Sequence, residues 1–192
     1  MKFDDIFQYN NEIERFFDQL EEIVEKNDTY LLDILPKTAD DPDKYKQFEL
    51  VWEHIVRDKN FPKQNNFLVE EIKFINFFKK LWLYNKVKVY IYEFSRSKSN
   101  FLKLANTKEE FYYWAKNNAG KTIFDLSIDK LELLISMGIR DIISSIFVYE
   151  DIEIIFWSTG GLAWLVYFNR QDNIEFIKNM AIVEGLYLYF RK

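Results

Sequence analysis

Residues 144–168 read SSIFVYEDIEIIFWSTGGLAWLVYF, and this segment gives the clearest indication of the fold. It contains three short runs of β-branched and aromatic residues, at 146–149, 152–157 and 162–168. Such runs are typical of strands, and Thr159-Gly160-Gly161 is typical of a tight turn between the last two. The sequence therefore predicts an antiparallel meander. Because the run 162–168 lacks polar alternation, it predicts a central strand that is covered on both faces.

The segments on either side of the meander predict short helices and further strands. From residue 86, Val87, Val89 and Ile91 alternate with polar or aromatic residues, which predicts a strand. Residues 95–100 predict a polar turn, and a short apolar piece occupies 123–126. A capping box of Thr107 and Glu110 predicts a helix that stops at Gly120. Further helices are predicted over 128–137, closed by Gly138, and over 174–181, followed by a strand over 186–190.

The first 85 residues have helical periodicity instead. We predict helices over 4–27, 42–58 and 67–84, with an apolar connector over 30–35 that ends at Pro36. Asp41 is a suitable N-cap for the second helix, and Pro42 suits its first position. The third helix is apolar on most sides, which indicates a buried hub for the other elements.

These elements predict the fold class α+β. A helical N-terminal half of about three helices is expected to pack on a small, mainly antiparallel C-terminal sheet with two or three short helices. A chain of 192 residues is long enough for one domain with a sizeable core. We therefore predict a single domain over 1–192, with a helical part at 1–85 and an α/β part at 86–192.

Composition excludes several kinds of chemistry. The chain has no cysteine, and His54 is its single histidine, which excludes disulfides, cysteine nucleophiles and metal sites that need two imidazoles. Gly120-Lys121-Thr122 lacks the earlier glycine of a phosphate-binding loop. Glu70 to Lys73, and the acidic group at 150, 151 and 153, are expected to be solvated surface. We predict no catalytic residues, no metal site and no cofactor, so catalysis is disfavoured.

The distribution of charge and the absence of targeting signals indicate which ligands and which cellular location to expect. Residues 1–60 carry a net charge of −8 and residues 61–192 a net charge of +3. This asymmetry disfavours nucleic acid as a ligand, because phosphate binding requires clustered Lys and Arg. The N-terminus lacks the basic and apolar regions of a secretory signal, and the longest uncharged run, 154–169, is shorter than a membrane span. The chain is therefore expected to be soluble and cytoplasmic.

One face of the first predicted helix carries an acidic stripe at helical spacing, formed by Glu14, Asp18, Glu21, Glu22 and Glu25. The opposite face is apolar. Carboxylates one turn apart repel each other by a few tenths of a kcal/mol. Two interpretations remain open. The stripe is either a solvated face or a docking surface for a basic protein partner.

The small size, acidity, high aromatic content and absence of cysteine together resemble the bacterial immunity proteins of polymorphic and contact-dependent toxin systems. The resemblance is one of overall character and assigns no residue a role. It implies an inhibitor that neutralises a basic bacterial toxin by direct binding. The alternative is a small-ligand-binding protein or enzyme whose site is an aromatic-lined pocket. A third possibility is a homo-oligomer that covers the aromatic surplus, and the sequence leaves the oligomeric state open.

Overall fold

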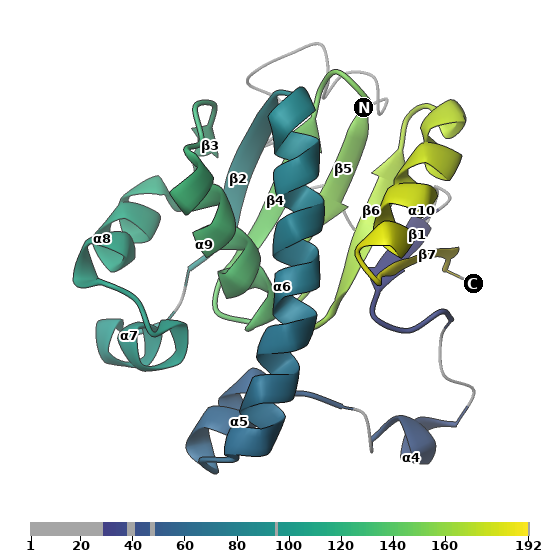
Figure 1. Ribbon diagram of the computed structural model, residues 1–192. Helices are drawn as coiled ribbons and strands as arrows, with labels where there is room; N and C mark the ends of the chain where they lie inside the picture. The colour runs from purple at the N-terminus through teal and green to yellow at the C-terminus, as the bar shows by residue number, and fades with distance from the viewer. Residues whose placement is uncertain (1–28, 38–40, 47–48, 95, 192) are drawn as a thin grey trace.

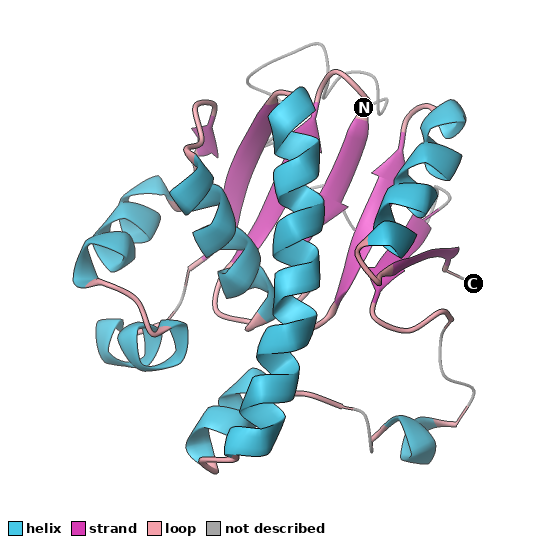
Figure 2. Cartoon of the chain, in the orientation of Figure 1, coloured by secondary structure: helices cyan, strands magenta, loops and turns pink. Residues whose placement is uncertain are grey.

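A seven-stranded sheet forms the centre of the chain in a computed structural model that describes residues 29–37, 41–46, 49–94 and 96–191 (Figure 1). The strand order is β3-β2-β4-β5-β6-β1-β7, and every ladder between these strands is antiparallel. Helices α6, α9 and α10 lie in front of the sheet in the view of Figures 1 and 2. The combination confirms the α+β class.

The predicted meander is present. It consists of β4 (Ser144–Tyr149), β5 (Ile154–Trp157) and β6 (Ala163–Phe168), with the Gly160-Gly161 turn between the last two. In β6 the four consecutive residues 164–167 are buried, so both faces of this strand are covered as predicted. The predicted strand after residue 86 is β2 (Val87–Glu93), which pairs with β4 and with the short β3 (Thr122–Ile123).

The predicted division into a helical N-terminal half and a C-terminal sheet is wrong. Residues expected to form a connector instead form β1 (Thr29–Asp33), which lies between β6 and β7 (Tyr187–Phe190). Thr29 is opposite Tyr167, and Asp33 is opposite Tyr187. The isolated sequence does not reveal this strand because its pairing partners lie more than 120 residues away. The sheet is also larger than predicted, and four helices follow β2.

The predicted helix over 42–58 is interrupted. Pro42–Tyr45 form α4 and Trp52–Arg57 form α5. Asp41 caps α4 as predicted, because its Oδ1 accepts a hydrogen bond from the backbone N–H of Asp43 at 3.0 Å. Trp52 and Ile55 of α5 are buried, whereas Tyr45 of α4 and Val51 before α5 are exposed. In a continuous helix the whole apolar stripe would face the core, but only the residues of α5 do.

Helix α6 (Phe61–Tyr84) begins six residues earlier than predicted, because the side chain of Asn60 accepts a hydrogen bond from the backbone N–H of Lys63 at 3.1 Å. Its inner face carries the buried aromatic residues of the core, and Phe78 contacts Phe147, Phe156 and Trp164. The expectation of a helix buried nearly all round is wrong, because Leu68 and Ile72 are exposed. Helix α6 covers the sheet with one face only.

The remaining helices lie on either side of α6 (Figure 1). They are α7 (Lys98–Ala105), α8 (Glu109–Asn118), α9 (Ile128–Ile139) and α10 (Ile174–Val183), the last preceded by the 3-10 turn η1 (Gln171–Asn173). The predicted turn over 95–100 is wrong in its second half, where α7 begins with Ser97 as its N-cap. The capping box at Thr107 is not formed, since Lys108 occupies the N-cap of α8 without a side-chain bond. Helix α9 continues through Gly138 instead of stopping there.

Candidate functional site

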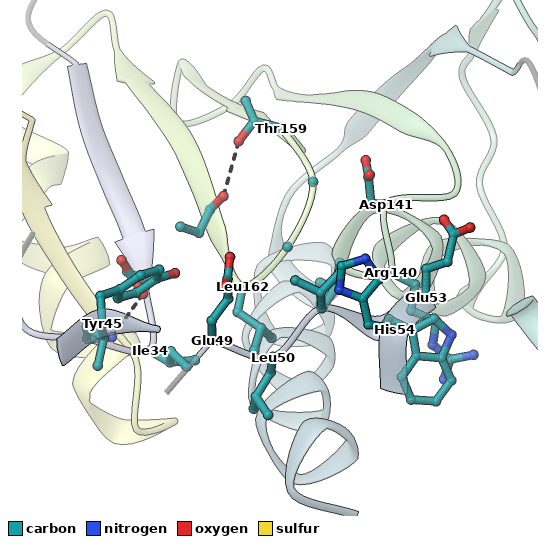
Figure 3. A pocket seen from close by; sticks show the side chains of 18 residues that line it. Ile34, Tyr45, Glu49, Leu50, Glu53, His54, Arg140, Asp141, Thr159 and Leu162 are labelled. Atoms are coloured by element: carbon teal, nitrogen blue, oxygen red, sulfur yellow. Dashed lines mark hydrogen bonds between the residues drawn. The ribbon is translucent and has the colours of Figure 1, made fainter. Parts of the chain in front are cut away.

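A pocket of about 480 Å³ opens at the end of the sheet where β1, the β5–β6 turn, α5 and α9 meet (Figure 3). Its wall combines apolar, aromatic and charged side chains from segments that are far apart in sequence. Four carboxylates line it, and the cationic or titratable nitrogen groups of the lining are those of His54 and Arg140. The carboxylates are Asp33, Glu49, Glu53 and Asp141.

The β5–β6 turn forms the upper rim of the pocket through Thr159, Gly160 and Gly161. The hydroxyl of Thr159 donates a hydrogen bond to the carbonyl of Ala163 at 3.2 Å (Figure 3). Gly160 has a φ of 86°, and a Cβ atom there would lie 2.7 Å from Oδ1 of Asp141. Glycine therefore allows the turn to approach the end of α9 closely at this edge.

Arg140 is held rigidly at the base of the pocket. Its Nε and Nη2 donate to the two carboxylate oxygens of Glu71 on α6, both at 2.7 Å, and its Nη1 donates to the carbonyl of Ala105 at 2.8 Å. The guanidinium lies 4.5 Å from the centre of the Trp52 ring. Glu71 is buried and forms both bonds, so this carboxylate outside the pocket lining balances the charge of Arg140.

A second arginine balances one of the lining carboxylates. Arg96 donates through Nη1 to Glu53 at 3.0 Å and through Nη2 to the backbone carbonyl of Asp141 at 2.8 Å. Asp141 itself adopts a left-handed backbone conformation with a φ of 55°. This side of the pocket is therefore built from groups that already have partners.

The opposite side of the pocket carries Asp33, Glu49 and the ring of Tyr45. Asp33 accepts hydrogen bonds from the Tyr189 hydroxyl at 2.7 Å and from the Leu35 N–H at 3.0 Å. Burial raises the pKa of Asp33 despite these bonds. Burial also raises the pKa of Tyr45, and the charges of Asp33 and Glu49 raise it further. Among the residues that the structure describes, neither carboxylate forms a salt bridge, so this side is electronegative.

His54 lies on the exposed side of α5 and lines the pocket. No serine or cysteine is among the described residues that line the pocket with it. The Thr159 hydroxyl also lines the pocket, and it donates a hydrogen bond to the carbonyl of Ala163. The chemistry that the pocket wall offers is electrostatic binding of a positively charged group beside an aromatic ring.

The sequence-predicted partner-binding residues Glu14, Asp18, Glu21, Glu22 and Glu25 all lie outside the described residues. Of the other acidic groups, which were expected to be solvated surface, Glu71 is instead buried and pairs with Arg140. The others also have partners. Glu70 pairs with Lys73 at 2.6 Å along α6, and Glu150 pairs with Lys88. Asp151 accepts a hydrogen bond from the Lys86 N–H at 2.9 Å. Within the described ranges, no group of three or more metal-ligating side chains is found.

Sequence reasoning missed Asp33, Tyr45 and Glu49 as site residues. Asp33 ends a strand that was predicted to be a connector, and Tyr45 and Glu49 fall within the helix that is interrupted. The available signal was the short apolar run that ends at Pro36, because such a run bounded by a turn residue is also consistent with a buried strand.

No family model matches the chain, and searches of curated proteins and of solved structures likewise give no match. The functional conclusion therefore depends on the charge and shape of the pocket and on the sequence. None of the helices in the described part of the chain is both long enough and apolar enough to cross a membrane.

Proposed function

We propose that this chain is a small acidic protein-binding module, and that it acts as an immunity-type inhibitor of a basic bacterial toxin. The observation that carries the proposal is the electronegative side of the pocket, where Asp33 and Glu49 lie beside Tyr45 without a salt bridge to a described residue. A partner that supplies positive charge would complete this surface.

The distribution of charge along the chain supports the same kind of partner. The first 60 residues carry a net charge of −8, and they include both the predicted acidic stripe and three of the four pocket carboxylates. Toxins that cleave nucleic acid need positively charged clefts, and an acidic surface is attracted to such a cleft over long distances. The inhibitor would act in the cytoplasm, bind no nucleic acid and need no cofactor.

The test uses the product of the gene immediately upstream as the candidate partner. The first variant replaces Asp18, Glu21, Glu22 and Glu25 with lysine. We expect the association rate constant at low salt to fall by about tenfold or more, because electrostatic steering is lost. Protection of cells from that product should fall in parallel, while the thermal unfolding midpoint stays close to that of the wild type.

A matched control carries the same change in net charge elsewhere in the chain. It replaces Asp125, Asp129, Asp172 and Glu175, all of which are exposed, with lysine. We expect a much smaller change in the association rate. If the first variant associates and protects at the wild-type rate over a range of salt, the stripe is only solvated surface. If the wild-type chain neither binds the upstream product nor protects cells, the inhibitor proposal fails.

A second candidate function is the binding of a small organic cation. The pocket volume of about 480 Å³ lies within the range of small-molecule sites, and Tyr45 and Trp52 contribute aromatic surface to its wall. This function predicts a thermal shift with a small cationic compound, and it predicts no dependence on the acidic stripe.

A further inference from the structure

The described residues divide the pocket into a balanced side and an unbalanced side. On the balanced side, Glu71 neutralises Arg140 and Glu53 pairs with Arg96. On the other side, Asp33 and Glu49 have no cationic partner among the described residues, and Tyr45 lies close enough for both charges to influence its hydroxyl. Figure 3 shows Glu49 between Tyr45 and Leu50, with Ile34 beside the tyrosine.

We propose that this side of the pocket receives one arginine side chain of the partner, with its guanidinium between Asp33, Glu49 and the ring of Tyr45. The inference rests on the proposed function and specifies the group that the pocket recognises. It identifies three described residues as the recognition site, whereas the proposed function requires only a basic partner.

The chemistry of the pocket lining favours arginine over lysine. A guanidinium is planar, is more weakly hydrated than an ammonium, stacks on aromatic rings and donates to carboxylates through a fixed fork of N–H groups. Apolar side chains line the pocket next to the carboxylates, among them Ile34, Leu50 and Leu162. They would contact the methylene groups of the arginine stem while its charged end reaches Asp33 and Glu49.

The position of Asp33 makes it suitable for this role. Its two oxygens are oriented by the hydrogen bonds from Tyr189 and Leu35, so the carboxylate is fixed before a ligand arrives. Burial in the folded chain already removes part of the water around this carboxylate. An incoming guanidinium would therefore interact with it at a smaller further cost of desolvation. Glu49 is exposed and would contribute the second acceptor.

The experiment titrates the full chain with three blocked tripeptides, Gly-Arg-Gly, Gly-Lys-Gly and Gly-norleucine-Gly, and follows backbone amide chemical shifts by NMR. We expect the arginine peptide to shift the amides of Ile34, Leu50 and Leu162. The lysine peptide should bind about fivefold more weakly, and the norleucine peptide should cause no shift, since the charge and the planar fork are the recognised features.

Three variants test the residues named. Glu49→Gln changes an exposed side chain and should keep the fold intact, and we expect it to weaken arginine-peptide binding by about tenfold. Asp33→Asn should weaken binding to a similar degree, and Tyr45→Leu by about threefold. The matched control, Asp125→Asn with Glu175→Gln, removes two exposed charges outside the pocket and should leave peptide binding unchanged.

Several outcomes would overturn the inference. They are equal affinity for the arginine and lysine peptides, shifts outside the pocket, the absence of any shift, or binding that is insensitive to Glu49→Gln. None of these results would by itself remove the proposed function, which is judged by binding of the whole basic partner. Conversely, the arginine peptide could bind at the pocket while the upstream product does not bind the chain. That result would support the proposed arginine site and contradict the proposed inhibitor function.

Discussion

At the scale of single residues, Asp33 has the most consequential environment in the pocket. Its carboxylate is partly buried at the end of β1 and is hydrogen-bonded to Tyr189 and Leu35. Burial nevertheless dominates and raises the pKa of Asp33 above its ordinary value of 3.8. The ionised form therefore opposes folding, because its charge is less well solvated in the folded chain than in the unfolded chain.

The replacement Asp33→Asn tests this cost through the pH dependence of stability. Because the folded pKa is raised, the favourable contribution of Asp33 is fully present below pH 3.8 and is lost as the pH rises through the folded pKa. The neutral asparagine has no such dependence. We expect the variant to be more stable than the wild type at pH 7, and the difference to shrink towards pH 3. Urea unfolding at both pH values measures it, and a pH-independent difference would refute the explanation.

Gly138 is a second residue whose surroundings determine its identity. It lies inside α9, and a Cβ atom there would meet Cβ of Ser158 at 2.7 Å and Cζ2 of Trp164 at 2.9 Å. Glycine in a helix interior is ordinarily unfavourable by about 1 kcal/mol relative to alanine. At this position the close approach of α9 to the sheet outweighs that preference.

We expect Gly138→Ala to lower the free energy of unfolding by about 1–3 kcal/mol, as overpacking of a core does. The control is Ser136→Ala on the same helix, which improves helix propensity without this contact and should change stability by less than about 0.5 kcal/mol. Chemical denaturation provides both values. A gain in stability for Gly138→Ala would show that α9 can move away from β6 at little cost.

At the scale of elements, one buried ion pair connects several helices. Glu71 comes from α6, Arg140 follows α9, Ala105 ends α7 and Trp52 begins α5, and all four meet at the base of the pocket. Removing one charge of such a pair leaves the other buried without a partner, whereas replacing both by apolar groups avoids that penalty.

A double-mutant cycle with Glu71→Leu and Arg140→Met tests the coupling. Each single replacement is expected to lower the free energy of unfolding by about 3–5 kcal/mol. The double variant should lose much less than the sum, since no unpaired charge remains. Urea denaturation of the four proteins gives the coupling energy. Additive losses would mean that the two side chains contribute independently.

The strands differ in how well they could be predicted from the sequence. The strands β2, β4, β5 and β6 were predicted because alternation, apolar runs and the glycine turn are local signals. The strand β1 was missed because its stability comes from pairing with β6 and β7. The pocket was missed with it, since Asp33 ends β1 and Tyr45 and Glu49 lie where a continuous helix was expected. Side chains that are brought together by strands far apart in the sequence produce no local periodic pattern from which they could be predicted.

At the scale of the whole molecule, the uneven charge predicts a strong dependence of partner binding on ionic strength. The Debye length falls from about 10 Å at 0.1 M salt to about 3 Å at 1 M. If a basic partner is steered by the acidic N-terminal part, its association rate constant should fall by about tenfold or more over this range, with a smaller change in dissociation. Stopped-flow measurements separate the two rates, and a salt-independent association rate would argue against steering.

The place of β1 in the sheet also has a consequence for how the protein is made. This strand is among the first parts of the described chain to leave the ribosome, yet both of its neighbours, β6 and β7, are synthesised more than 120 residues later. Until they emerge, Tyr30 and Leu32 lack both of the strands with which β1 pairs. Pairings so distant in sequence also slow folding. Because β1 pairs with these two late strands, the sheet can be completed only after the last strands of the described chain have been synthesised.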